Sequence, residues 1–212
     1  MATFGELQTK VSKRLLDANN VAVSLSDVAD SINDAIRYYK KHIFWFNEIN
    51  DSVNLTTGDN TIPVTGDFLV LSKDNDGLNI EYSQQRYPLK KISQNEFDRR
   101  FLDNGFGIPQ VYAKIGQEYK CYPIPDRDYQ LNRYYLKDYD PLEGASDTND
   151  FTDNAERLIY LWACANLTAE FRQDDKMEAY YRNAATDEYN NLKSFTIRHN
   201  TSGQIEIDST LI

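Results

Sequence analysis

The stretch Asn33–Glu48, NDAIRYYKKHIFWFNE, joins a helical pattern to a run of aromatic residues. Apolar residues leading into it recur at spacings of 4, 4, 3 and 4, at Val28, Ile32, Ile36, Tyr39 and Ile43. This spacing predicts an amphipathic helix with Ser24 or Ser26 as its N-cap. Residues 40–42 (Lys-Lys-His) then fall in its last turn, where positive charge complements the helix dipole.

The aromatic rings that follow this helix must be buried against other residues. Phe44, Trp45 and Phe46 are consecutive, and a soluble chain does not leave such a run bare. We favour packing within the chain, with Ile43 and one or two of the rings capping the helices where they meet the next lobe. The alternative is a contact between Trp45 and a neighbouring copy or a partner.

Towards the N-terminus, residues 3–6 (Thr-Phe-Gly-Glu) fit a capping box with Thr3 as the cap. A first helix should run from there to about Asp17. Its apolar stripe is Phe4, Leu7, Val11 and Leu15.

Downstream, the apolar period changes to two from about Asp51, which predicts strands. Turn residues at 74–77 and 116–117 predict two hairpins, and a second capping box at 93–96 predicts a short helix. The following connector, 138–153, is acidic and rich in turn residues.

Two further helices are expected near the C-terminus. The stripe of the first, which we expect to be the most buried helix, is Ala155, Leu158, Trp162, Ala165 and Ala169. The stripe of the second is Met177, Tyr181, Ala185, Tyr189 and Leu192. Helical patterning stops after Phe195, and the rest is expected to be an extended arm.

These elements predict an α+β fold. N-terminal helices (1–48) and C-terminal helices (141–195) would form one bundle, because two helix pairs bury their stripes most simply against each other. A mainly antiparallel β-lobe with a short helix (49–140) would be inserted between them. The extended C-terminal arm would be 196–212.

Composition excludes several classes of protein. The net charge of −10 argues against a general nucleic-acid surface and against docking on anionic membranes. The longest apolar run, Leu158–Ala165, is far too short to span a bilayer, and no secretory signal is visible. We expect a soluble protein that folds in a reducing cytoplasm. Fifteen tyrosines suit interfaces that are packed and also wet.

No residue pattern indicates catalysis, a metal site or a cofactor. His42 is explained by its helix end, and His199 lies in a polar tail. Cys121 and Cys164 are read as core residues. Residues 74–77 fail the calcium-loop pattern and 105–107 fail the dinucleotide pattern. We therefore expect a non-enzymatic protein without metal or cofactor.

Five segments together resemble the head-to-tail adaptor (connector, or neck) proteins of tailed bacteriophages. They cover most of the chain in matching order, and the most specific piece is Tyr-x-Pro-x-Pro-Asp at Tyr122–Asp126. The segments are FGELQTKVSKRLLD (4–17), VADSINDAIRYYKKHIFWFNE (28–48), YPLKKISQNEFD (87–98), GIPQVYAKIGQEYKCYPIPDRDYQLNRYY (107–135) and AERLIYLWACANLTAEF (155–171).

The resemblance implies a structural virion protein, assembled in the host bacterial cytoplasm and located in the neck. It implies a ring of copies, usually twelve, which attaches beneath the portal protein, extends the DNA channel and docks the next tail or nozzle protein. DNA would pass without specific binding, and no membrane is involved. The candidate contacts with portal or neighbour are Phe44, Trp45, Phe195, Ile197, Ile205, Ile207, Leu211 and Ile212.

Three alternatives stay open. The chain could be another neck or tail component, such as a completion or nozzle-like protein, which gene order would distinguish. It could be a tail-associated hydrolase of glycan or peptidoglycan, which a zymogram would reveal. It could also be a free-standing cellular binding module.

Overall fold

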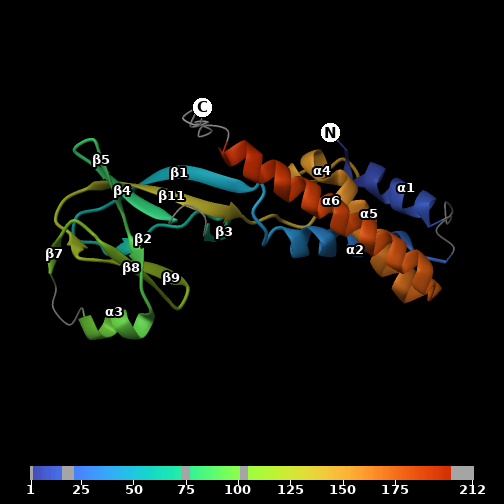
Figure 1. Ribbon diagram of the computed structural model, residues 1–212. Coiled ribbons are helices and arrows are strands. Elements are labelled where there is room, and N and C mark those ends of the chain that lie inside the picture. The colour runs from blue at the N-terminus through green and yellow to red at the C-terminus, as the bar shows by residue number, and fades with distance from the viewer. Residues whose placement is uncertain (1, 16–21, 73–76, 101–104, 202–212) are drawn as a thin grey trace, which may run out of the picture. The chain divides into compact units, whose positions relative to one another are not determined.

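The computed structural model describes residues 2–15, 22–72, 77–100 and 105–201 (Figure 1). The chain divides into two compact units. One comprises Met1–Asn47 with Tyr139–Ile212 and is helical. The other comprises Glu48–Asp138 and consists mainly of strands. The fold is therefore mixed α+β, as the sequence predicts.

Two capped helices open the helical unit: α1 (Phe4–Arg14) and α2 (Leu25–Tyr39). The capping box at Thr3 is confirmed, because its hydroxyl accepts from the Glu6 amide at 3.3 Å while its own amide donates to the Glu6 carboxylate at 2.9 Å. Of the two candidate serines, Ser24 is the N-cap of α2.

Four helical elements form the rest of this unit. They are α4 (Asp150–Asn154), α5 (Glu156–Leu167), the π-helical turn η1 (Thr168–Arg172) and α6 (Asp175–Thr201). The helix expected around 155–169 is present as α5, which continues into η1. Ala155, whose backbone is non-helical with φ −131°, separates it from α4, a short helix within the expected connector. Helix α5 contacts α1, α2 and α6.

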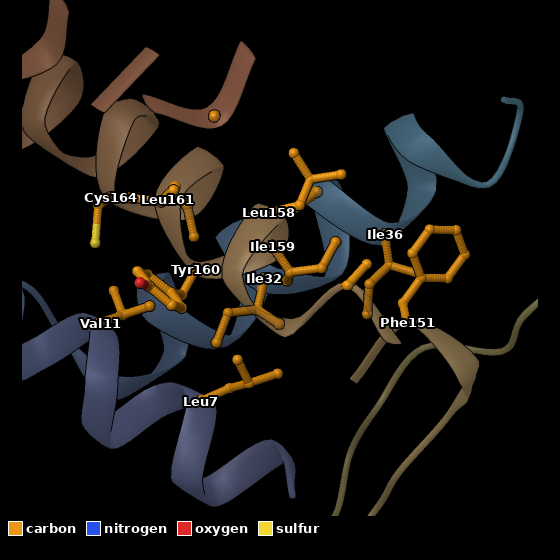
Figure 2. Close-up of a cluster of buried hydrophobic side chains, with 14 of the residues drawn as sticks. Leu7, Val11, Ile32, Ile36, Phe151, Leu158, Ile159, Tyr160, Leu161 and Cys164 are labelled. Carbon is orange, nitrogen blue, oxygen red and sulfur yellow. The ribbon is translucent and has the colours of Figure 1, made fainter. Parts of the chain in front are cut away.

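The core of the helical unit forms around α5. Figure 2 shows its side chains meeting those of α1, α2 and α4. The labelled members are Leu7, Val11, Ile32, Ile36, Phe151, Leu158, Ile159, Tyr160, Leu161 and Cys164. Because α5 is buried on nearly every side, it needs partners from both ends of the chain.

The expected end of the last helix is wrong. Helix α6 continues past Phe195 to Thr201, where an extended arm was predicted. The hydroxyl of Thr196 donates to the Leu192 carbonyl at 2.9 Å and accepts from the Trp45 amide at 3.3 Å. The first bond lies within the helix, and the second connects α6 to the aromatic run beyond the expected end of the helix. Ile205, Ile207, Leu211 and Ile212 lie outside the described residues.

In the β-rich unit, β11 (Tyr129–Lys137) is the central strand of a five-stranded antiparallel sheet. Strand β1 pairs with one edge of β11 along nearly its full length, so β3 and β4 share the other edge. Strand β5 covers β4. The bounds are β1 (Glu48–Leu55), β3 (Phe68–Leu71), β4 (Leu78–Tyr82) and β5 (Gln85–Pro88).

A second sheet of four strands has the order β2-β9-β8-β6, and β10 pairs with β7. The expected hairpin at 116–117 is confirmed: β8 and β9 are antiparallel, and Gly116 has φ +63°. The bounds are β2 (Thr61–Ile62), β6 (Lys90–Lys91), α3 (Gln94–Arg100), β7 (Phe106–Gly107), β8 (Val111–Ile115), β9 (Glu118–Tyr122) and β10 (Ile124–Pro125).

One buried ion pair fixes the register of β1 on β11. Arg133 is 1% exposed and stands directly opposite Asp51 in the ladder. Its Nε donates to one carboxylate oxygen of Asp51 at 2.8 Å, Nη2 donates to the other, and Nη1 donates to the Pro63 carbonyl. A slip of one residue would turn the carboxylate to the opposite face and leave the guanidinium buried without its partner.

We predict that Asp51→Ala destabilises the β-rich unit by about 3 kcal/mol, because it leaves a buried charge uncompensated. The measurement is hydrogen exchange of the β11 amides in native buffer and in urea.

The matched control is Glu118→Ala, which removes the exposed pair between Glu118 and Lys120 at 3.6 Å. It should cost less than about 1 kcal/mol. The double variant Asp51→Leu with Arg133→Met should recover most of the loss. Equal effects of the two single variants would show that burial of the pair is unimportant.

Candidate partner-binding surface

A buried amide shapes the aromatic run after α2. Asn47 is completely buried, and its side-chain oxygen accepts from the Phe44 amide at 2.8 Å. Its side-chain nitrogen donates to the His42 carbonyl at 2.9 Å. The backbone amide of Asn47 also donates to the Phe44 carbonyl, at 3.2 Å. The chain therefore turns tightly here, and consecutive rings meet different surroundings.

Two of the three rings belong to the core of the helical unit. Phe44 is completely buried and stacks on Phe46, with centroids 5.2 Å apart and planes 2° from parallel. Phe151 lies edge-on to both rings. Phe44 therefore offers no surface to a partner and is removed from the candidate contacts. For these rings, the explanation of packing within the chain is supported.

Trp45 packs on α6. Its ring centroid lies 4.6 Å from that of Phe195 and 4.9 Å from that of Phe46. A groove of about 460 Å³ opens beside this pair, lined by Trp45, Asn191, Leu192, Ser194, Phe195 and Arg198. We call it the Trp45–Phe195 groove. Phe195 remains 45% exposed, so the groove keeps an apolar wall open to a partner.

Ile197 does not join this groove. It is 58% exposed, but it lies two positions after Phe195. Two residues turn the helix by about 200°, so the two side chains lie on different faces of α6. The structure thus brings Trp45 and Phe195 together and separates Ile197 from them.

A second exposed apolar group lies at the start of α6, and sequence patterning missed it. Phe171 is 40% exposed, Met177 41% and Tyr180 59%. They flank the turn at Gln173, whose backbone is left-handed with φ 52°. We call them the elbow group. Met177 was expected in the buried stripe, but it lies in the first turns of α6, before the buried positions begin at Tyr181.

The side chains singled out for chemistry serve packing. His42 Nδ1 lies 3.1 Å from the Tyr189 hydroxyl. Burial, followed by Lys193 and Lys41, lowers the pKa of His42 below 6.5. At neutral pH the positive charge at the end of α2 therefore comes from Arg37, Lys40 and Lys41 and not from His42. Cys121 and Cys164 are buried, and burial raises the pKa of each thiol to about 12.

In the described part of the chain, no group of three His, Cys, Asp or Glu side chains is placed to hold a metal ion. No helix in that part is long and apolar enough to cross a membrane.

We predict that Trp45→Ala destabilises the helical unit by about 2 kcal/mol, because the ring is partly buried against α6. Ile197→Ser is the control on the same helix and should change stability by less than about 0.5 kcal/mol. Urea unfolding followed by helical circular dichroism measures both. Unchanged stability of Trp45→Ala would mean that a partner, and not this chain, is what the ring packs against.

We also predict that stability of the helical unit falls as the pH drops below 6.5. The pKa of His42 is depressed in the folded state, so the unfolded chain takes up a proton there that the folded chain does not. Tryptophan fluorescence melts between pH 7.5 and 5 measure the slope. In His42→Asn this slope should flatten; an unaltered slope would assign it to other groups.

Comparison with known proteins identifies the family of this chain. A search of the curated proteins found no match to this chain. A family model described as "SU10 adaptor protein" matches residues 2–205, which include both compact units and all of α6. The match confirms the resemblance to phage head-to-tail adaptors that the sequence segments indicate. The chain therefore belongs to the SU10 adaptor protein family, and it is a phage adaptor protein.

Proposed function

We propose that this protein forms the ring of the virion neck that binds beneath the portal protein, extends the DNA channel and docks the tail. The observation that carries the proposal is the family match over residues 2–205. The protein acts by association of surfaces and not by catalysis. It assembles in the host bacterial cytoplasm and needs no cofactor.

Exposed apolar side chains at both ends of α6 support a ring. A closed ring of identical subunits joins head to tail, so each subunit presents two different faces. The elbow group lies near the start of α6 and the Trp45–Phe195 groove near its end. From Met177 to Phe195, the helix rises about 27 Å at 1.5 Å per residue. One subunit can therefore contact different partners at the two ends of α6.

The charge of the chain supports a passage for DNA. With 33 acidic and 23 basic residues, the net charge is −10. Like charge keeps phosphate from adhering to a wall, whereas a basic wall would release counterions and hold the DNA. DNA would therefore slide through the ring without specific binding.

We predict that mixing this protein with the portal of the same genome yields a defined complex. Mass photometry should show one copy per portal subunit. Phe195→Ser should weaken the complex at least about tenfold if the Trp45–Phe195 groove takes part, because aromatic anchors dominate such interfaces.

Leu25→Ser is the matched control, since it removes an apolar side chain of similar exposure that is not among the candidate contacts. Persistent separation of the two proteins, with a portal that binds its other partners, would overturn the proposal. A completion or nozzle-like component of the tail would then be the better assignment.

A further inference from the structure

One edge of β3 has no strand beside it in the described part of the chain. Strands β3 and β4 lie along the same edge of β11, but β5 covers only β4. The Leu89 amide donates to the Leu78 carbonyl at 3.0 Å, and the next residue, Lys90, already pairs with β8 in the other sheet. The chain therefore leaves the sheet before it reaches β3, and no strand of the described residues pairs with that edge.

The sequence of β3 makes this open edge unusual. Its residues are Phe-Leu-Val-Leu, and Val70 is 38% exposed. Proteins usually protect an open edge with charged residues or proline, because an apolar edge recruits other strands. Strand β3 carries neither. Such an edge is compatible with a soluble protein when another segment covers it.

A groove accompanies the open edge. It has a volume of about 420 Å³ and is lined by Val70, Leu71, Ser72, Pro88, Leu89, Lys90, Lys91, Tyr112 and Tyr119. Leu71, Leu89 and the two tyrosines are buried and form an apolar floor. The side chains of Lys90 and Lys91 are exposed, and neither makes an ion pair with an acid in the described part of the chain. We call it the β3 groove.

The end of the same chain has the chemistry that fits this groove. Residues 205–208 read Ile-Glu-Ile-Asp. In an extended strand, alternate side chains point to opposite faces, so Ile205 and Ile207 would share one face and Glu206 and Asp208 the other. Apolar side chains match the floor of the β3 groove, and carboxylates match the lysines at its rim.

We propose that the C-terminal arm of one copy docks as an extended strand in the β3 groove of a neighbouring copy. The inference rests on the proposed ring. In a closed head-to-tail ring every groove receives one arm, so no edge remains open and no arm remains unbound. Eleven residues follow Thr201 in the sequence, and extended at about 3.3 Å each they reach at most about 36 Å from the end of α6.

Cross-linking between two full-length variants tests the docking. Val70→Cys marks the groove and Ile207→Cys marks the arm. The variants are mixed in equal amounts, alone and with the portal, and treated with a short bismaleimide. The native cysteines are suitable background, because both are buried and burial raises the pKa of each thiol to about 12.

We expect a covalent dimer that contains one copy of each variant, and no dimer of either variant with itself. Reversing Lys90 and Lys91 to Glu should reduce the yield about tenfold, and also reversing Glu206 and Asp208 to Lys should restore it, because the two sets of charges are complementary. The double variant Val70→Cys with Ile207→Cys detects docking within one chain.

The outcomes separate this inference from the proposed function. Assembly with the portal but no mixed dimer would overturn the docking and leave the ring intact. Cross-linking only within the doubly substituted chain would also overturn it. A mixed dimer formed without any portal complex would support docking between copies while the portal role fails. Absence of the mixed dimer under both conditions overturns the inference.

Discussion

The constraint on which the helical unit depends is that α5 must be covered on nearly every side. Eight of its twelve residues are buried, and no single neighbouring helix can cover so wide an apolar surface. Helices α1 and α2 come from before the β-rich unit, and α6 comes from after it. The fold of this unit therefore depends on contacts between residues more than 100 positions apart in sequence. The strands between them need only return the chain, which is why they can form a separate unit with its own core.

The local elements that the sequence predicts are those with strong local chemistry. The capping box at Thr3 and the hairpin at Gly116 depend on neighbouring residues only, and the structure has both. The apolar period of α2 likewise marks its buried face, with Val28, Ile32 and Ile36 in the core. The sequence fails to predict the bounds of an element where residues distant in sequence contact it. The predicted end of α6 at Phe195 is an example, since Trp45, about 150 positions earlier, contacts Phe195 and Thr196 in a helix that continues to Thr201.

The candidate partner-binding surface likewise could not be predicted in full from the sequence. Phe44, Trp45 and Phe46 are three consecutive large aromatic residues, and their sequence does not say which ring is covered. Asn47 decides this, because its side chain closes the turn that sends Phe44 into the core and leaves Trp45 on α6. An asparagine in that position carries no visible signal before the turn is known. The exposure of the elbow group was equally unpredictable from the sequence, because Met177 fits the helical apolar spacing that elsewhere marks buried positions.

An assembly protein is expected to show residues that its own fold does not explain. The apolar edge of β3 is one such feature, and the alternation of isoleucine and carboxylate at 205–208 is another. Each would be a liability in a protein that acts alone, because open strands and unpaired apolar side chains promote aggregation. The proposed docking pairs the two, since the isoleucines match an apolar groove and the carboxylates match the charge of Lys90 and Lys91. In the proposed ring, docking of each arm on the β3 edge of a neighbour would remove both liabilities at once, because a closed ring leaves no subunit without a neighbour.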